Sequence, residues 1–277
     1  IPGGGIYQAA TSRLSLVYYL LLTSFARLAG AKVLLPAQGL GPFGSLAPSS
    51  LLRRWLTYEL KAADYLSFRD EGSAAVFAET AGSSAANVAT DLVFLSGGGA
   101  TGHVRTKDSL RLGAILRSSN HDADRIAADL IRMNEDIENL VLVPVAFQPG
   151  EDESVWRRAG WQGEILFAEN PAEVFAQFDL VVTMRLHACI VATSLSIPWL
   201  GIAYDPKVSA FAAACRWQLC CQPSEAVRSL LDEKLNLMAG RRAELADRLH
   251  RLACENHRIA SADFARMLQA VVLSDQS

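Results

Sequence analysis

Two kinds of apolar stretch alternate along the chain. Short apolar runs rich in Leu, Val and Ile indicate buried strands, and longer stretches with helical spacing indicate helices packed on a sheet. This alternation predicts an α/β fold with parallel sheets. The expected strands are residues 32–36, 65–68, 86–90, 112–116, 140–145, 164–167, 180–183 and 199–203. The expected helices are residues 11–29, 49–63, a helix opening at Asp70 and Glu71, 122–134, 171–177, 186–195, and an amphipathic region 225–273 with a break at Gly240.

One glycine-rich interior segment, residues 96–102, divides this pattern into two parts. We therefore expect an N-terminal Rossmann-like domain over residues 1–96, a linker over 97–107, and a C-terminal Rossmann-like domain with C-terminal helices over 108–277. The helical tail could also pack across a domain or return to the first one. Open α/β domains bind ligands at the carboxyl ends of their strands, so strand-to-helix junctions are where a site is expected.

Composition and charge exclude several classes of protein. The 26 Lys and Arg against 29 Asp and Glu leave a net charge of -3, which disfavours general nucleic-acid binding. The most apolar run, residues 14–22, is too short to span a bilayer, so at most a peripheral membrane contact is expected. Five cysteines without a CxxC pair are typical of a reduced, cytoplasmic chain. Cys220 and Cys221 are adjacent and lack nearby partners, so we interpret them as packing residues and expect no metal.

Two arginines directly follow predicted strands. Arg69 comes after residues 65–68, and Arg117 comes after residues 112–116. A guanidinium at this edge can make bidentate contacts to phosphate or carboxylate, although a purely structural role is also open. Asp70 and Glu71 need no functional explanation, because an N-cap and an acid in the first helical turn are stabilising.

Two glycine-containing turns offer backbone amides to an anion. Residues 3–5 form a Gly-Gly-Gly run, which places Gly4 and Gly5 before a helix. Gln38 begins a second flexible turn, Gln-Gly-Leu-Gly-Pro, at the end of a strand. A plain structural turn explains either segment equally well.

The junction after residues 180–183 is the most informative. Arg185 and His187 stand two positions apart between an apolar strand and an apolar helix, so both can face a cleft at the sheet edge. An imidazole near a helix N-terminus and two arginines would have its charged form disfavoured, which suits proton transfer near neutral pH. Asp205 and Lys207 follow the next strand; they can contact a substrate, or Asp205 can simply start the next helix. The residues alone predict an anion-binding cleft with a candidate acid or base.

Nine segments follow one another between Gly3 and Val208: GGGIYQ, SRLSLVYYL, QGLGP, FRDEGS, TDLVF, GAILR, VPVAFQ, TMRLHACIVA and GIAYDPKV. In this order they resemble the polysaccharide pyruvyl transferase family, specifically its bacterial cell-wall (CsaB-type) branch. The resemblance implies a GT-B-like fold of two Rossmann-like domains. It also implies transfer of the enolpyruvyl group of phosphoenolpyruvate onto two sugar hydroxyls, giving a cyclic pyruvate ketal. The acceptor would be a lipid-linked or nucleotide-linked cell-wall saccharide, and no cofactor is implied beyond the donor substrate.

The resemblance also implies roles for individual residues. The Arg-Leu-His triplet of the family matches residues 185–187, so His187 is expected as the general acid or base. Arg185 and Arg69 join it as catalytic residues. The expected substrate-binding residues are Arg117, Gly4, Gly5, Gln38, Asp205 and Lys207.

The chain departs from the family pattern in two ways. It lacks the first strand and glycine-rich loop that usually precede the Gly-Gly-Gly segment, so we expect an N-terminally incomplete first domain. Ala9 stands close to where relatives often carry Asp, which puts acceptor activation in doubt. Two alternatives to a pyruvyl transferase therefore stay open: a GT-B glycosyltransferase that uses a nucleotide sugar, and an inactive anion-binding relative.

Overall fold

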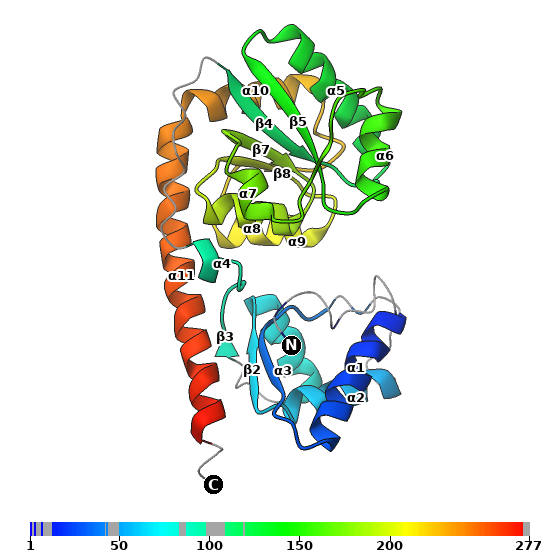
Figure 1. Ribbon diagram of the computed structural model, residues 1–277, viewed down its shortest axis with the longest axis vertical. Coiled ribbons are helices and arrows are strands. Elements are labelled where there is room, and N and C mark those ends of the chain that lie inside the picture. The colour runs from blue at the N-terminus through cyan, green and yellow to red at the C-terminus, as the bar shows by residue number, and fades with distance from the viewer. Residues whose placement is uncertain are drawn as a thin grey trace. The chain divides into compact units, whose positions relative to one another are not determined.

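The computed structural model (Figure 1) describes residues 1, 3, 7, 13–41, 43, 50–82, 87–97, 109–118 and 120–273. The chain folds into two compact units. The first contains Ile1–Ser96 together with Glu255–Ser277, and the second contains Gly97–Cys254. The predicted glycine-rich linker lies almost entirely outside the described residues.

The first unit contains a three-stranded parallel sheet in the order β1-β2-β3. Its strands are β1 (Leu34–Gln38), β2 (Tyr65–Phe68) and β3 (Asn87–Val88), and its helices are α1 (Arg13–Leu28), α2 (Leu51–Lys61) and α3 (Glu71–Ala81). A short helix, α4 (Phe94–Gly97), ends this part of the chain. The side chains of α1, α2 and α3 bury a common apolar core with β1 and β2, which includes Leu16, Leu20, Leu35, Leu56 and Phe68.

The second unit contains a six-stranded sheet in the order β6-β5-β4-β7-β8-β9, with every pair parallel. The strands are β4 (Leu110–Ile115), β5 (Leu140–Ala146), β6 (Leu166–Phe167), β7 (Leu180–Thr183), β8 (Trp199–Ile202) and β9 (Cys220–Cys221). The helices are α5 (Ala123–Asp136), α6 (Glu151–Arg158), α7 (Pro171–Phe175), α8 (Leu186–Ser194), α9 (Pro206–Ala214) and α10 (Arg228–Gly240), followed by α11 (Arg242–Leu273).

This strand order is that of a doubly wound Rossmann fold. The chain moves outward from β4 through β5 to β6, and then returns to β7 on the other side of β4. Helix α5 contacts α6 and α10, helix α8 contacts α7 and α9, and Figure 1 shows the two groups on opposite faces of the sheet. The direction of winding therefore reverses between β4 and β7.

The predicted strands are present, and two have the expected limits: β2 at residues 65–68 and β7 at 180–183. The first strand begins two residues later than expected and continues to Gln38, because residues beyond Pro36 still pair with β2. The structure adds α4, α6 and β9, which the pattern did not predict, and α9, which the sequence indicated only as a helix that Asp205 could start. Helix α6 is short and strongly charged, so it carries little apolar periodicity.

The C-terminal helix requires a correction to the expected domain limits. We expected residues 108–277 to form one domain, but residues 255–277 belong to the first unit. Asp263 of α11 is fully buried and accepts hydrogen bonds from the hydroxyls of Tyr65 (2.6 Å) and Ser67 (2.7 Å), both on β2. Thr90 likewise donates to Asn256 (2.6 Å). Buried polar groups on the sheet thus anchor the second half of α11.

Burial, together with the hydrogen bond to Asp263, raises the pKa of Tyr65 to about 12. The phenol therefore stays protonated and keeps donating across the physiological range. Ser67 extends the network, because its hydroxyl also accepts a hydrogen bond from the backbone N–H of Ala37 (2.8 Å). One carboxylate thereby links α11 to β2 and, through Ser67, to β1.

No helix in the described part of the chain is both long and apolar enough to cross a membrane.

Asp263→Ala is expected to lower the opening free energy of the first sheet by about 2–4 kcal/mol, because it leaves two buried hydroxyls without an acceptor. Hydrogen exchange at the amides of β2 measures this change. Exchange in β4 and β7 should not change, since they belong to the other unit. The matched control on the same helix is Asp247→Ala, whose exposed ion pair with Arg251 should contribute less than about 0.5 kcal/mol. Equal effects of the two substitutions would contradict the anchoring role of Asp263.

Candidate functional site

The candidate site of the second unit lies at the carboxyl edge of its sheet. Strands β5, β4, β7 and β8 are consecutive neighbours and parallel, so the segments that follow them meet at one edge. Arg117 follows β4, and Arg185 follows β7. These two strands flank the point where the winding direction reverses, which is where open α/β sheets bind ligands. The structure thus places both predicted arginines at the switch point.

Arg185 is held by a buried carboxylate. Its Nη2 donates to Oδ1 of Asp152 (2.6 Å) and to Oε1 of Gln148 (2.9 Å). The Asp152 side chain is fully buried, and the Arg185 side chain is 14% exposed. Because a buried ion pair is weakly screened and geometrically demanding, this contact fixes the direction of the guanidinium.

Asp152 is itself fixed by the backbone. Its Oδ2 accepts hydrogen bonds from the N–H groups of Phe147 (2.9 Å) and Gln148 (3.0 Å), in the loop between β5 and α6. The backbone N–H of Arg185 donates in turn to the Thr183 hydroxyl (2.9 Å). The loops after β5 and β7 are therefore tied together around a single carboxylate.

Both arginines present a buried N–H without a partner. Nε of Arg185 and Nε of Arg117 are buried, and neither makes a hydrogen bond within the described residues. Nη1 of Arg117 donates to the Tyr204 hydroxyl (2.7 Å), which comes from the loop after β8. A buried guanidinium N–H is costly to leave unpaired, so each of these arginines retains hydrogen-bonding capacity at the sheet edge.

The other residues predicted for this edge, His187, Asp205 and Lys207, lie at the starts of helices α8 and α9. His187 lies in the first turn of α8, two residues after Arg185, and its side chain is exposed. Asp205 caps α9 by accepting a hydrogen bond from the backbone N–H of Lys207 (2.9 Å). The helix-starting role that the sequence allowed for Asp205 is thus present, and substrate contacts by Asp205 and Lys207 stay predictions.

A hollow of about 390 Å³ opens at the ends of β5 and β6. Its lining includes Phe147, Phe167 and Glu169, and Ala146, Pro149 and Ala168 complete it. The Phe147 ring also faces Arg185, whose guanidinium carbon lies 6.0 Å from the ring centroid. The hollow therefore adjoins the arginine at the switch point.

The first unit has a comparable edge of its own. Arg69 follows β2 and its backbone N–H donates to the carbonyl of Gln38 at the end of β1 (3.0 Å). The Arg69 guanidinium lies near the carboxylates of Asp91 (3.4 Å) and Asp70 (3.5 Å). The Gln38 side chain is fully buried, with its Nε2 bonded to the carbonyls of Ile1 and Pro36. Arg69 and Gln38 thus share one edge, while their expected roles toward substrate stay predictions.

The glycine-rich segment before α1 is described in part. A Cβ on Gly3 would lie 2.2 Å from the carbonyl oxygen of Ala37, so only glycine fits this close approach to the end of β1. Ala37 itself has a positive φ of 50°. Gly4 and Gly5, expected to bind substrate, and Ala9 lie outside the described residues.

The remaining acidic residues and the cysteines do not suggest a further site in the described regions. No group of three or more His, Cys, Asp and Glu side chains there is arranged to hold a metal ion. Burial raises the pKa of Cys221 to about 11 and that of Cys215 to about 11, so these thiols stay protonated and pack as small apolar groups.

Sequence reasoning missed two residues of the site. Asp152 belongs to α6, which was not predicted, although the Pro149-Gly150 turn after β5 followed by three acidic residues is a helix-start signal. Tyr204 precedes the predicted Asp205, and nothing in its local sequence distinguishes it from a packing tyrosine. Its contact with Arg117 spans 87 residues of sequence, so only the fold reveals it.

Asp152→Ala is expected to destabilise the second unit by about 3–5 kcal/mol, because it leaves the mostly buried Arg185 guanidinium without its counter-charge. Urea denaturation monitored by tryptophan fluorescence measures the loss. The matched control is Asp124→Ala, which removes an exposed ion pair to Arg158 and should contribute less than about 1 kcal/mol. A loss for Asp152→Ala no larger than the control's would contradict the positioning role of Asp152.

Comparison with known proteins places these features in a family. The family model for polysaccharide pyruvyl transferase matches residues 1–206. A search of curated proteins found no match. Among solved structures, MurG from Acinetobacter baumannii is similar with a TM-score of 0.54 and 10% identity, covering 92% of this chain and 79% of that one. The α,α-trehalose 6-phosphate synthase from Burkholderia multivorans is similar with a TM-score of 0.54 and 12% identity, covering 94% and 71%.

These structural likenesses confirm the predicted α/β, GT-B-like fold. They are too distant in sequence to carry a reaction or a substrate to this chain. The family match spans well over half of the chain and includes the switch-point residues Arg117, Arg185 and His187. The chain is therefore a transferase that belongs to the polysaccharide pyruvyl transferase family.

Proposed function

We propose that this protein transfers the enolpyruvyl group of phosphoenolpyruvate onto a cell-wall saccharide precursor, forming a pyruvate ketal. The observation that carries the proposal is the pair of arginines at the switch point, each with a buried Nε that lacks a partner within the described residues. Family membership supports a transferase that acts on a polysaccharide. The identity of the donor, the CsaB-type branch and the cell-wall acceptor belong to the proposal.

Phosphoenolpyruvate carries a phosphate and a carboxylate, both of which a guanidinium binds well. In our proposal Arg117 and Arg185 bind these two groups at the carboxyl ends of β4 and β7. The contact with Asp152 holds Arg185 by its Nη2 edge. The other N–H groups of the guanidinium are then left to meet the donor, and Tyr204 orients Arg117 in the same manner.

The reaction needs proton transfer at two stages. A proton adds to the methylene carbon of the donor and leaves a cationic centre at the neighbouring carbon. One sugar hydroxyl attacks this centre and loses its proton. Phosphate then leaves with the bonding electron pair, and the second hydroxyl closes the ring and loses its own proton. The products are a cyclic ketal and inorganic phosphate. We assign the proton transfers to His187, which is exposed beside Arg185.

We place the saccharide acceptor in the hollow at the ends of β5 and β6. Aromatic rings such as Phe147 and Phe167 can stack on the apolar face of a sugar, and the Glu169 carboxylate can accept hydrogen bonds from its hydroxyls. Phe147 lies between this hollow and Arg185, which would bring the acceptor hydroxyls toward the donor. A lipid-linked or nucleotide-linked precursor is made in the cytoplasm, and the five unpaired cysteines are in keeping with that compartment.

The proposal is tested by incubating the protein with phosphoenolpyruvate and saccharide acceptors, and by measuring phosphate release together with the gain of pyruvate mass. His187→Gln should lower kcat by about 10²–10⁴-fold, because it removes the general acid or base. Arg117→Gln should raise KM for phosphoenolpyruvate by about 10-fold or more, because it removes a charged donor. His250→Gln, on α11, is the control and should leave both constants unchanged.

A glycosyl transfer reaction is the alternative that the fold favours, because the two structural relatives named above have the same fold as this chain. In that alternative, a nucleotide sugar replaces phosphoenolpyruvate as the donor. Product formation that depends on a nucleotide sugar, with no pyruvate mass gained, would overturn the pyruvyl transferase proposal. Phosphoenolpyruvate binding without turnover, unaffected by His187→Gln, would instead favour an inactive anion-binding relative.

The acceptor assignment makes a separate prediction. Phe167→Ala should raise KM for the saccharide by about 5–50-fold while leaving KM for phosphoenolpyruvate unchanged, because it removes one stacking face of the hollow. The matched control is Phe264→Ala on α11, since both rings are 39% exposed. A change in KM for the donor rather than the saccharide would place the acceptor elsewhere.

A further inference from the structure

Helix α1 carries apolar side chains on two opposite faces. Leu16, Leu20 and Thr23 are buried against the first unit. The other face consists of large exposed side chains, with Leu14 82% and Leu28 76% exposed. At 3.6 residues per turn, these side chains fall within an arc of roughly 120° and form one continuous stripe. The α1 stripe consists of Leu14, Tyr18, Leu21, Leu22, Phe25 and Leu28.

The surface of α2 continues this apolar area at the C-terminal end of α1. The Tyr58 ring on α2 is exposed, and the guanidinium carbon of Arg27 on α1 lies 4.8 Å from its centroid. Arg27 also pairs with Glu59 of α2 (3.1 Å), a contact that fixes the two helices side by side. A continuous apolar surface of this kind on a folded protein usually marks an interaction site.

Charge is distributed unevenly in the same part of the chain. Residues 1–63 contain six of the 26 Lys and Arg residues but one of the 29 Asp and Glu residues, although the whole chain has a net charge of -3. That single acid, Glu59, is buried and paired with Arg27. Burial alone would raise the pKa of Glu59. Hydrogen bonds from Arg27, Ser24 and Trp55 outweigh this effect, so the pKa of Glu59 is lowered. The exposed charged side chains of α1 and α2 themselves are therefore positive.

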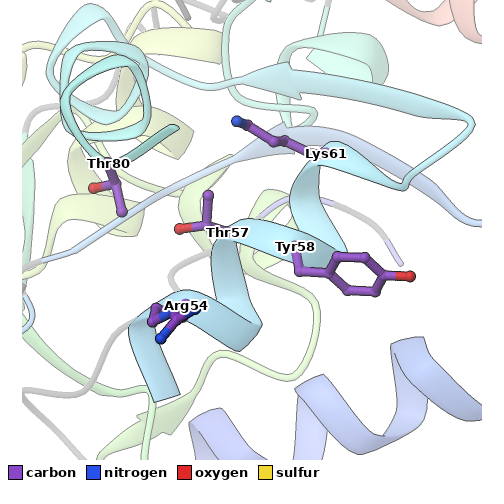
Figure 2. Close-up of a pocket in the computed structure, with 5 residues that line it drawn as sticks. All are labelled: Arg54, Thr57, Tyr58, Lys61 and Thr80. Carbon is purple, nitrogen blue, oxygen red and sulfur yellow. The ribbon is translucent and has the colours of Figure 1, made fainter. Parts of the chain in front are cut away.

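A hollow of about 270 Å³ lies on α2, facing α3. Figure 2 shows Arg54, Thr57, Tyr58 and Lys61 along α2, with Thr80 of α3 opposite. The Arg54 guanidinium is exposed and makes no hydrogen bond or ion pair within the described residues. Two cations and three hydroxyl groups line this hollow, and its positive charge suits a phosphate group. Tyr58 belongs to both the hollow and the apolar area beside α1.

We propose that α1 and α2 form a docking surface for a membrane that contains anionic phospholipid. The α1 stripe enters the interfacial layer, and the cations of α1 and α2 meet the headgroup phosphates, with Arg54 and Lys61 around one of them. Helix α1 lies in the plane of the interface, because it has 16 residues and is too short to span the hydrocarbon core. A second copy of this chain is a poorer partner, since two positively charged surfaces would repel each other.

The proposal goes beyond the reaction and does not depend on it, because binding is measured without donor or acceptor. The full chain is sedimented with vesicles of phosphatidylglycerol and phosphatidylcholine, and with vesicles of phosphatidylcholine alone. We expect binding to the anionic vesicles to be at least about 10-fold stronger, and to weaken as salt is raised. Equal binding to both, or no binding to either, would overturn the proposal.

Two double variants separate the apolar and charged contributions. Tyr18→Ser with Phe25→Ser should lower the partition onto anionic vesicles by about 10-fold or more, and Arg54→Gln with Lys61→Gln by about 5-fold or more. The matched control is Phe264→Ser with Leu268→Ser, which removes exposed apolar residues four positions apart on α11 and should change binding less than about 2-fold. Unchanged binding by the α1 variant would contradict the docking role of the stripe.

Two further measurements keep the test independent of folding. Circular dichroism checks that each variant is folded, and hydrogen exchange of the unaltered chain should slow over residues 13–28 when anionic vesicles are added. Sedimentation velocity then measures whether the chain dimerises, which tests a second copy of the chain as the partner of the α1 stripe. If the unaltered chain dimerises, fails to bind vesicles and becomes monomeric in the α1 variant, the stripe is an interface between copies and the membrane proposal is wrong.

Discussion

The buried carboxylate of Asp152 is the contact on which the candidate site depends. It accepts two backbone N–H groups from the loop after β5 and pairs with Arg185 at the start of α8. This single group therefore joins two loops that belong to strands on opposite sides of β4. A desolvated carboxylate has few alternative partners, so the arrangement is rigid. Arg185 is consequently held in one direction at the end of β7, and Arg117 lies at the end of the neighbouring strand β4.

The first unit uses the same principle for a structural purpose. Asp263 is buried on α11 and accepts hydrogen bonds from two hydroxyls on β2, which attaches the end of the chain to a sheet formed near its beginning. A long helix thus contributes residues to both units, with its first part in the second unit and its last part in the first. In both units, one buried carboxylate holds together segments that are distant in sequence and fixes their local arrangement.

Sequence patterns predicted those features whose cause is local. The strands β2 and β7 are short, mostly apolar runs bounded by polar residues or turns, so their limits were correct. The N-cap of α3 at Asp70 was also predicted, because the capping bond to the N–H of Ser73 spans only three residues. Helix α6 was missed, because its apolar contacts depend on few buried residues, and β9 was missed because its two residues form a strand only by pairing with β8.

By itself, the sequence determined the α/β class, the alternation of strands and helices, and the presence of Arg117, Arg185 and His187 after strands. These follow from periodicity and from position relative to apolar runs, which are local properties. Tertiary structure alone decided which strands are neighbours, and therefore that Arg117 and Arg185 flank one switch point. It also decided that Asp152 and Tyr204 support them, that α11 returns to the first sheet, and that one face of α1 is exposed among the described residues. Such outcomes depend on contacts between residues far apart in sequence, and no local pattern encodes them.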